Sequence, residues 1–213
     1  MSNEAALQKD ALLLALLPNV AFDGWTRAAM RAAADRVEID AAGLDLLFPR
    51  GPRDAVAWFS NWADRQTIDA LKRRRIATLK IRARIAAGVS TRLGVLLPYR
   101  EAVRRSLTVL GSPGNLPLGA KLLYNTVDAL WHAAGDRSTD FNFYTKRGLL
   151  AAVYAATTLY WLDDRSEETQ ATAAFLDRRL AEVLAIPRWR EGIDRLNPVR
   201  LLRGVRNRFS AAG

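Results

Sequence analysis

Apolar residues recur along most of the chain at the three- and four-residue spacing of a helix face, and no segment reads convincingly as a strand. One such face in the segment 25–37 consists of Trp25, Ala29, Ala33 and Val37. A second stripe contains Leu123, Val127, Leu130, Trp131 and Ala134. Gly135 follows this stripe where a helix C-cap belongs. The spacing predicts an all-α chain of about nine or ten helices.

Prolines and capping residues mark the expected helix ends. Pro18 is expected to stop a short apolar helix, and a long helix with possible breaks is expected from Pro52 onward. Another helix is expected from near Asp140 through Trp161. The last of this series should begin at Ser166 as its N-cap and end before Pro187.

Composition excludes several kinds of site. Half of the 213 residues are hydrophobic, so the chain can bury a real core. It has no cysteine and one histidine, His132, which excludes disulfides, thiolate metal sites and His-rich metal sites. Glu-x-x-His pairs, Gly-rich phosphate loops and an obvious nucleophile are also missing. We therefore expect no metal site and no catalytic site, and expect His132 to form a hydrogen bond at a helix end.

The net charge of +10 favours an anionic partner, either nucleic acid or an acidic membrane surface. No targeting or spanning segment is expected, because the longest apolar run, residues 149–162, would extend only about 21 Å as a helix, against ~30 Å of hydrocarbon. The basic run 72–84 occupies nearly all sides of a helix. That distribution is typical of a solvated face or a helix join, although contact with anionic lipid or an acidic partner is an alternative.

The C-terminal segment has the pattern of an interfacial helix. Asn197 and Pro198 suit its first positions, and residues 196–213 contain no acidic side chain. The expected membrane contacts are Leu201, Leu202, Val205, Phe209, Arg203 and Arg206. Their apolar side chains gather on one side, and long arginine stems can reach an anionic surface. The alternative is that this helix docks onto the protein's own body.

The stretch "TVDALWHAAGDRSTDFNFYTKRGLLAAVYAATTLYWLDD", residues 126–164, closely resembles the ubiquinone-biosynthesis accessory family Coq-nine, in its bacterial branch. The resemblance covers roughly residues 18–185 and is weakest over 50–80. It implies an α-helical fold similar to TetR-type regulators, a lipid-binding cavity, and support for the di-iron demethoxyubiquinone hydroxylase. We accordingly expect a vestigial helix-turn-helix region (1–55), a lipid-binding domain (56–186) and a C-terminal membrane-contact segment (187–213).

Two candidate sites follow from this resemblance together with helical spacing. The expected lipid pocket is lined from the helices 118–134 and 141–161 by Leu123, Val127, Leu130, Val153 and Tyr154. The alternative is that these residues simply pack together.

The expected docking surface for the hydroxylase consists of Asp140, Phe143, Tyr144 and Arg147, which share one face at a helix start. Mitochondrial members of the family carry Trp-Tyr where this chain has Phe143-Tyr144. The substitution removes an indole N–H donor from any partner contact. The alternative is a helix capped by Asp140 whose first aromatic residues cover the end of the bundle.

The TetR-like resemblance raises a rival function, that of a ligand-responsive transcriptional regulator. Its helix-turn-helix would be Trp25–Val37 followed by Asp40–Leu47. The second helix offers Asp40 and Asp45 and no Arg, Lys, Asn or Gln for base edges. Carboxylates repel phosphates, so we expect at most weak, non-specific DNA binding, supported by flanking arginines.

The expected function is a non-enzymatic one. The resemblance implies a lipid-binding accessory protein that presents a polyprenyl quinone intermediate to the hydroxylase. It would carry an isoprenoid or a phospholipid rather than a cofactor. Its expected place is the cytoplasm, peripheral on the inner face of the bacterial inner membrane, and a homodimer is left open.

Overall fold

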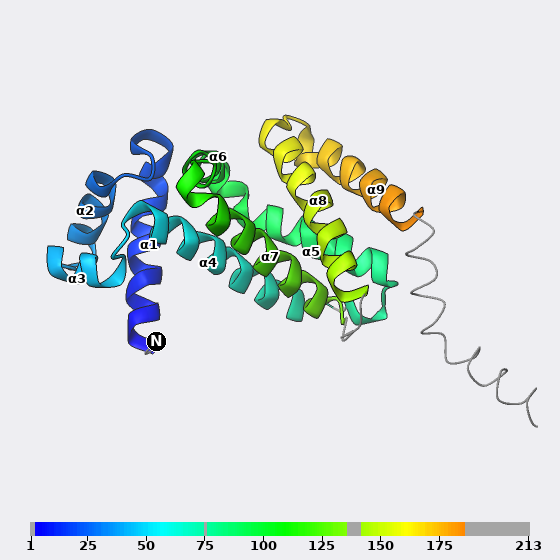
Figure 1. The fold of residues 1–213 in the computed structure, drawn as a ribbon, viewed down its shortest axis with the longest axis horizontal. Coiled ribbons are helices and arrows are strands. Elements are labelled where there is room, and N and C mark those ends of the chain that lie inside the picture. The colour runs from blue at the N-terminus through cyan, green and yellow to red at the C-terminus, as the bar shows by residue number, and fades with distance from the viewer. Residues whose placement is uncertain (1–2, 75, 136–141, 186–213) are drawn as a thin grey trace, which may run out of the picture.

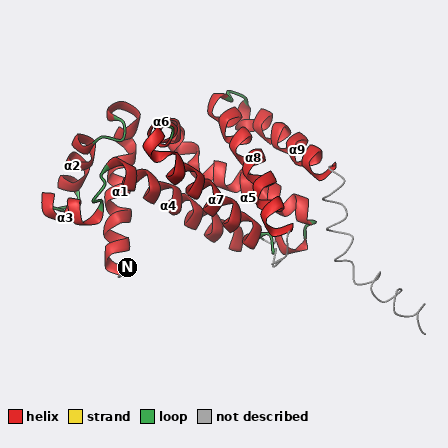
Figure 2. Ribbon diagram, viewed as in Figure 1, coloured by secondary structure: helices red, strands yellow, loops and turns green. Residues whose placement is uncertain are grey.

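The computed structural model describes residues 3–74, 76–135 and 142–185, and this part of the chain is almost entirely helical (Figure 2). Its α-helices are α1 (Asn3–Asp23), α2 (Arg27–Arg36), α3 (Ala41–Leu47), α4 (Pro52–Lys72), α5 (Ile81–Leu96), α6 (Arg100–Leu110), α7 (Leu116–Ala133), α8 (Asn142–Asp163) and α9 (Gln170–Ala185). Short 3-10 turns are η1 (Ile76–Thr78), η2 (Leu97–Tyr99), η3 (Pro113–Asn115) and η4 (Glu167–Thr169). The predicted all-α class is confirmed, with nine α-helices in the described residues.

The helices form an elongated bundle (Figure 1). At one end α1 packs against α2, which contacts α3, and α1 also contacts α4 and α6. The long helices α4, α5 and α7 pack together along the middle. At the other end α8 contacts α7 and α9, and α9 also reaches α5. Buried apolar residues from both ends belong to one continuous core.

The structure corrects the expected break at Pro18. Helix α1 passes through Pro18 and ends at Asp23. An interior proline costs about 3 kcal/mol in a helix. Burying each large apolar side chain contributes about 1.5–3 kcal/mol, and α1 buries such residues on both sides of the proline. They are Leu12, Leu13, Leu16, Leu17 and Val20.

The longer α1 also revises the expectation about spanning segments. In the described ranges, α1 is the one helix whose length and composition would allow it to cross a membrane. The sequence prediction missed it because it ended the helix at Pro18. In this structure the five buried residues of α1 lie in the protein core, as in a core helix of a folded domain.

Helices α2 and α3 lie where the helix-turn-helix was predicted. The Thr26 hydroxyl caps α2 by accepting from the Ala29 N–H at 3.1 Å. The Asp40 carboxylate caps α3 by accepting from the Gly43 N–H at 2.7 Å. Both caps satisfy backbone donors that a helix start leaves unpaired.

The basic run 72–84 is a helix join, one of the alternatives given above. Helix α4 ends at Lys72, and α5 begins at Ile81 after the short turn η1. The Arg84 guanidinium holds the join by donating to the carbonyls of Leu79, at 2.8 Å, and Ala134, at 3.0 Å. Gly135, with φ of +88°, ends α7 beside it, as predicted for a C-cap glycine.

The turn between α8 and α9 is held by a buried carboxylate. Asp164 accepts from the N–H groups of Ser166 and Thr172, each at 2.8 Å, and from both of their hydroxyls. The hydrogen bonds from Ser166, then those from Thr172, hold the pKa of Asp164 well below its ordinary value. Ser166, the predicted N-cap residue, is the N-cap of η4, and its hydroxyl accepts from the Ala171 N–H in the first turn of α9 at 3.0 Å. Asp164 satisfies the N–H of Thr172 in the same turn. Helix α9 ends at Ala185, before Pro187 as expected.

Candidate functional site

A cavity of about 620 Å³ lies between α4, α5, α6, α7 and α8. Its walls are mostly apolar and include Val56, Phe59, Leu96, Val103, Leu122 and Leu123. Its polar side chains are Ser60, Arg92, Ser106, Thr126, Tyr154 and Thr158. This volume and this mixture of many apolar walls with a few polar groups are typical of small-molecule binding sites.

The predicted pocket residues divide into two groups. Leu123 and Tyr154 line the cavity. Val127, Leu130 and Val153 do not line it, and all three are buried in the core. Leu130 covers Gly88 of α5, where an added Cβ would come within 3.1 Å of its side chain. Val153 lines a separate void of about 20 Å³ beside α9. Helical spacing identifies a buried face, but it does not show where that face packs tightly and where it leaves space.

Helices α7 and α8, the two predicted to line the pocket, supply about half of the cavity wall. The part that was missed at the sequence level comes from α4, α5 and α6. Their apolar residues have the same spacing as ordinary core residues, so no local signal separates them. The short hydroxyl-bearing residues Ser60 and Ser106 on otherwise apolar helix faces are the one hint that the sequence offers.

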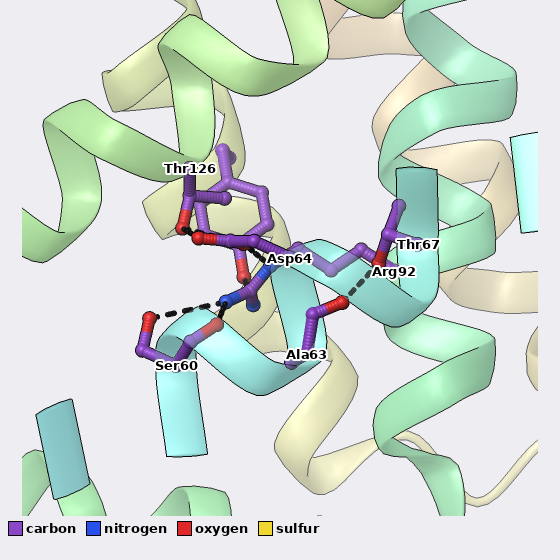
Figure 3. A network of polar contacts seen from close by, with 7 residues as sticks. Ser60, Ala63, Asp64, Thr67, Arg92 and Thr126 are labelled. Atoms are coloured by element: carbon purple, nitrogen blue, oxygen red, sulfur yellow. Dashed lines mark hydrogen bonds and ion pairs between the residues drawn. The ribbon is translucent and has the colours of Figure 1, made fainter. Parts of the chain in front are cut away.

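The buried ion pair between Arg92 and Asp64 belongs to a network of polar contacts beside the cavity, drawn in Figure 3. The Arg92 guanidinium donates to the Asp64 carboxylate at 2.7 Å, to the Ser60 hydroxyl at 3.3 Å and to the Tyr154 phenol oxygen. Asp64 also accepts from the Thr126 hydroxyl at 3.0 and 3.1 Å. The network therefore joins α4, α5, α7 and α8 across the bundle.

Arg92 remains charged within this network. Burial is the largest influence on its pKa and lowers it, but the neighbouring Tyr154 and Asp64 together raise the pKa above its ordinary value. The side chain of Arg92 is 6% exposed and that of Asp64 is 14% exposed. A pair this buried persists only when its remaining donors and acceptors are satisfied, and the hydroxyls of Ser60 and Thr126 serve this purpose.

Exposed leucines border the same cavity. Leu107 of α6, Leu116 of α7 and Leu159 of α8 all line it, and Leu116 and Leu159 are 56% and 58% exposed. These side chains contact both the cavity and solvent, so they mark the rim of the cavity. They also give the protein an apolar edge of the kind that contacts other molecules.

The predicted docking residues are separated by the structure. Tyr144 is 72% exposed near the start of α8. Arg147 is 2% exposed and donates to Asp128 of α7 at 2.6 Å. The expectation that the Arg147 guanidinium lies with Tyr144 on one exposed face is therefore wrong. One helical turn is enough to move a side chain from the surface to the junction between α7 and α8.

Asp140 lies outside the described residues, and for Phe143 the structure describes only its place in the α8 backbone. Residues 187–213, with all of the expected membrane contacts, are also outside them. The His132 Nδ1–H donates a hydrogen bond to the Asp128 carbonyl at 2.9 Å in the last turn of α7. The helix-end hydrogen bond predicted for His132 is thus present.

Within residues 3–74, 76–135 and 142–185, no cluster of three or more His, Cys, Asp or Glu side chains is placed to hold a metal ion. Arg92 and Asp64, the buried ion pair beside the cavity, also form hydrogen bonds with the hydroxyls of Ser60 and Thr126. The site is thus a cavity with an apolar interior and a small polar area.

A helix-turn-helix end joined to a helical body is the architecture of the TetR class of proteins. The structure is similar to the crystal structure of the TetR transcriptional regulator from Nitrosomonas europaea ATCC 19718. The TM-score is 0.67 at 20% sequence identity, over 82% of this chain and 97% of that chain. This likeness establishes a TetR-like fold.

The sequence comparisons identify the family within that fold. Residues 116–187 match the COQ9 (Coq-nine) family model. The mitochondrial ubiquinone biosynthesis protein COQ9 of Homo sapiens is 32% identical over 179 residues, which is 81% of this chain and 56% of that protein. COQ9-A of Xenopus laevis is 31% identical over 191 residues, 86% of this chain and 60% of that protein. The Coq-nine resemblance is confirmed, and residues 116–187 belong to the COQ9 family. The chain spans just over half the length of these curated relatives.

Proposed function

We propose that this protein is a lipid-binding accessory factor of ubiquinone biosynthesis. The observation that carries the proposal is the apolar cavity of about 620 Å³, bordered by exposed leucines, in a chain related to proteins named for ubiquinone biosynthesis. The proposed role is non-enzymatic: the protein binds a polyprenyl quinone intermediate and presents it to the di-iron demethoxyubiquinone hydroxylase.

The physical need for such a factor follows from the ligand. A polyprenylated quinone is too apolar to leave a bilayer unaided, because each buried methylene adds about 0.8 kcal/mol to its retention. A cavity walled by α4 to α8 can replace the bilayer around the quinone ring and the first part of its tail. Transfer to a hydroxylase then requires no passage of the ring through water.

The place of action belongs to the same proposal. A net charge of +10 favours an anionic membrane surface. We infer that the protein works as a peripheral protein on the inner face of a bacterial inner membrane, with residues 187–213 as its membrane-contact segment.

Native mass spectrometry with lipid extraction tests the proposal, and a cavity-filling variant makes the test specific. Ala155 of α8 lines the cavity, so Ala155→Phe should remove the co-purifying isoprenoid or phospholipid seen with the wild type. Ala152→Phe places the same side chain on the exposed side of α8 and should retain the lipid. Wild-type protein from its native host that carries neither isoprenoid nor phospholipid would contradict the proposed function.

A regulator of the TetR type is the second candidate, because the fold is shared with one. The chemistry of α3 argues against it. Asp45 on that helix already binds Arg27 at 2.8 Å, so this flanking guanidinium is engaged by a carboxylate. Leu46 beside it is exposed and offers no hydrogen bond to a base.

A further inference from the structure

The hydroxyl groups that line the cavity differ in whether the protein satisfies them. Ser106 donates to the Ala102 carbonyl at 2.8 Å, and Thr126 donates to Asp64. Ser60 accepts from Arg92. Thr158 is 7% exposed, and its buried hydroxyl has no hydrogen-bond partner among the described residues. A buried hydroxyl without a partner costs free energy, so a ligand that pairs with it gains affinity.

A second hydroxyl lies one helical turn away. Tyr154 and Thr158 are four residues apart on α8 and both line the cavity. The Tyr154 oxygen accepts from Arg92, and the described residues provide no acceptor for its own proton. Donation from a guanidinium polarises the phenol and strengthens it as a donor. The cavity thus presents two hydroxyls on one helix face.

The charge of the cavity limits what these hydroxyls can bind. Arg92 is the one charged residue among the described residues that line it, and Asp64 neutralises it at 2.7 Å. A carboxylate or phosphate inside the cavity would lose its hydration without gaining a free cation, which is costly. An uncharged carbonyl or ether oxygen loses much less hydration free energy on entering the cavity.

We propose that the cavity binds its ligand head-first, with an uncharged carbonyl or ether oxygen of the head group accepting hydrogen bonds from Tyr154 and Thr158. This inference rests on the proposed function, and it adds the ligand class and the orientation. The apolar tail leaves the cavity past Leu107, Leu116 and Leu159. A quinone ring has the required chemistry, since its oxygens accept hydrogen bonds and carry no charge. A phospholipid would have to bury a charged phosphate to lie in this orientation.

Two probes with the same tail test the proposal by isothermal titration calorimetry. One is a dimethoxy-methyl benzoquinone that carries a decyl tail, and the other is decylbenzene, which has no oxygen. Thr158→Val removes the hydroxyl and keeps the side-chain volume. We expect Thr158→Val and Tyr154→Phe each to weaken binding of the quinone probe by roughly three- to tenfold. Neither variant should change binding of decylbenzene.

Thr157→Val is the matched control. Thr157 is the neighbouring residue, is fully buried, and donates to the Val153 carbonyl at 2.7 Å without lining the cavity. This variant should lower the melting temperature and leave quinone affinity unchanged. Thr158→Val should leave the melting temperature unchanged or raise it, because it removes an unpaired buried hydroxyl.

The outcomes separate this inference from the proposed function. Equal quinone affinity of the folded Thr158→Val variant and the wild type overturns the head-first orientation while leaving a lipid cavity in place. Palmitate that binds more tightly than hexadecanol also overturns it, because an anion would then be preferred. Failure of the wild type to bind either decyl probe overturns both.

Discussion

Asp164 is a buried carboxylate that holds the turn between α8 and α9 through four hydrogen bonds, from Ser166 and Thr172. Asp164→Asn removes the charge that strengthens these bonds and should lower the free energy of unfolding by roughly 1–3 kcal/mol at pH 7. Asp163→Asn is the control, since Asp163 is exposed and its one ion-pair partner in the described part of the chain is the exposed Arg104. Its cost should stay below about 1 kcal/mol. Urea unfolding of the three proteins measures both values.

The pH dependence of this effect has a definite sign. The pKa of Asp164 is lowered on folding, so its stabilisation is fully present above the unfolded value of about 3.9 and is lost as the pH falls through the folded value. The gap in unfolding free energy between wild type and Asp164→Asn should therefore be constant from about pH 5 to 7 and shrink below about pH 4. A gap that grew on acidification would refute this account of the turn.

Tyr144 is the residue of the expected docking surface whose role can be tested directly. It is exposed near the start of α8, and truncation of an aromatic anchor in an interface often costs more than about 2 kcal/mol. Tyr144→Ala should therefore weaken co-purification with the hydroxylase and cause the demethoxy intermediate to accumulate in cells. Tyr124→Ala, at an exposed tyrosine of α7, is the control and should have no effect.

Circular dichroism and melting must first show that the Tyr144→Ala fold is intact. Arg147 is a poor probe of docking, because removing its buried guanidinium breaks the ion pair with Asp128 at the junction of α7 and α8. If folded Tyr144→Ala and Phe143→Ala both bind the hydroxylase like the wild type, the start of α8 is only a helix end.

At the scale of elements, α3 is the helix on which the two candidate functions make different demands, since a regulator would use it to contact DNA. Its Asp45 is exposed and paired with Arg27, and the helix carries no Arg, Lys, Asn or Gln for base edges. DNA binding should therefore be weak, insensitive to sequence and abolished by moderate salt. Titration of unrelated duplexes at low and at physiological ionic strength measures this. A footprint on a defined operator that persists at physiological ionic strength would support the regulator instead.

At the scale of the whole molecule, membrane attachment is predicted to reside in the C-terminal segment. The apolar residues of 196–213 could contribute about 1.5–3 kcal/mol each, and each arginine near an anionic leaflet about 1 kcal/mol. A chain truncated after Arg195 should float less with anionic liposomes than the full chain does. Equal flotation of both chains would assign membrane contact to another surface, such as the rim at Leu116 and Leu159.

The sequence by itself determined the helical class, most helix ends and the family. Those features are local: the glycine after α7 and the end of α9 before Pro187 depend on residues a few positions apart. The caps at Thr26 and Asp40 are equally local but were not predicted, and the sequence left a helix join and a solvated face as alternatives for the run 72–84. Pro18 is the exception. Its local preference was overridden by apolar contacts that α1 makes with helices distant in the chain.

Only the tertiary structure decided where the cavity lies and what it can bind. Val127 and Leu123 belong to the same predicted stripe, yet one is fully buried in the core and the other lines a hollow. The difference depends on whether a side chain from α4, α5 or α6 fills the space opposite, which helical periodicity does not encode. The pairing of Arg92 with Asp64 joins residues 28 positions apart, and that of Arg92 with Tyr154 joins residues 62 apart. Tyr144 and Arg147 lie one turn apart on α8, yet Tyr144 is exposed and Arg147 is buried. Arg147 becomes buried only because α7 packs against that part of α8.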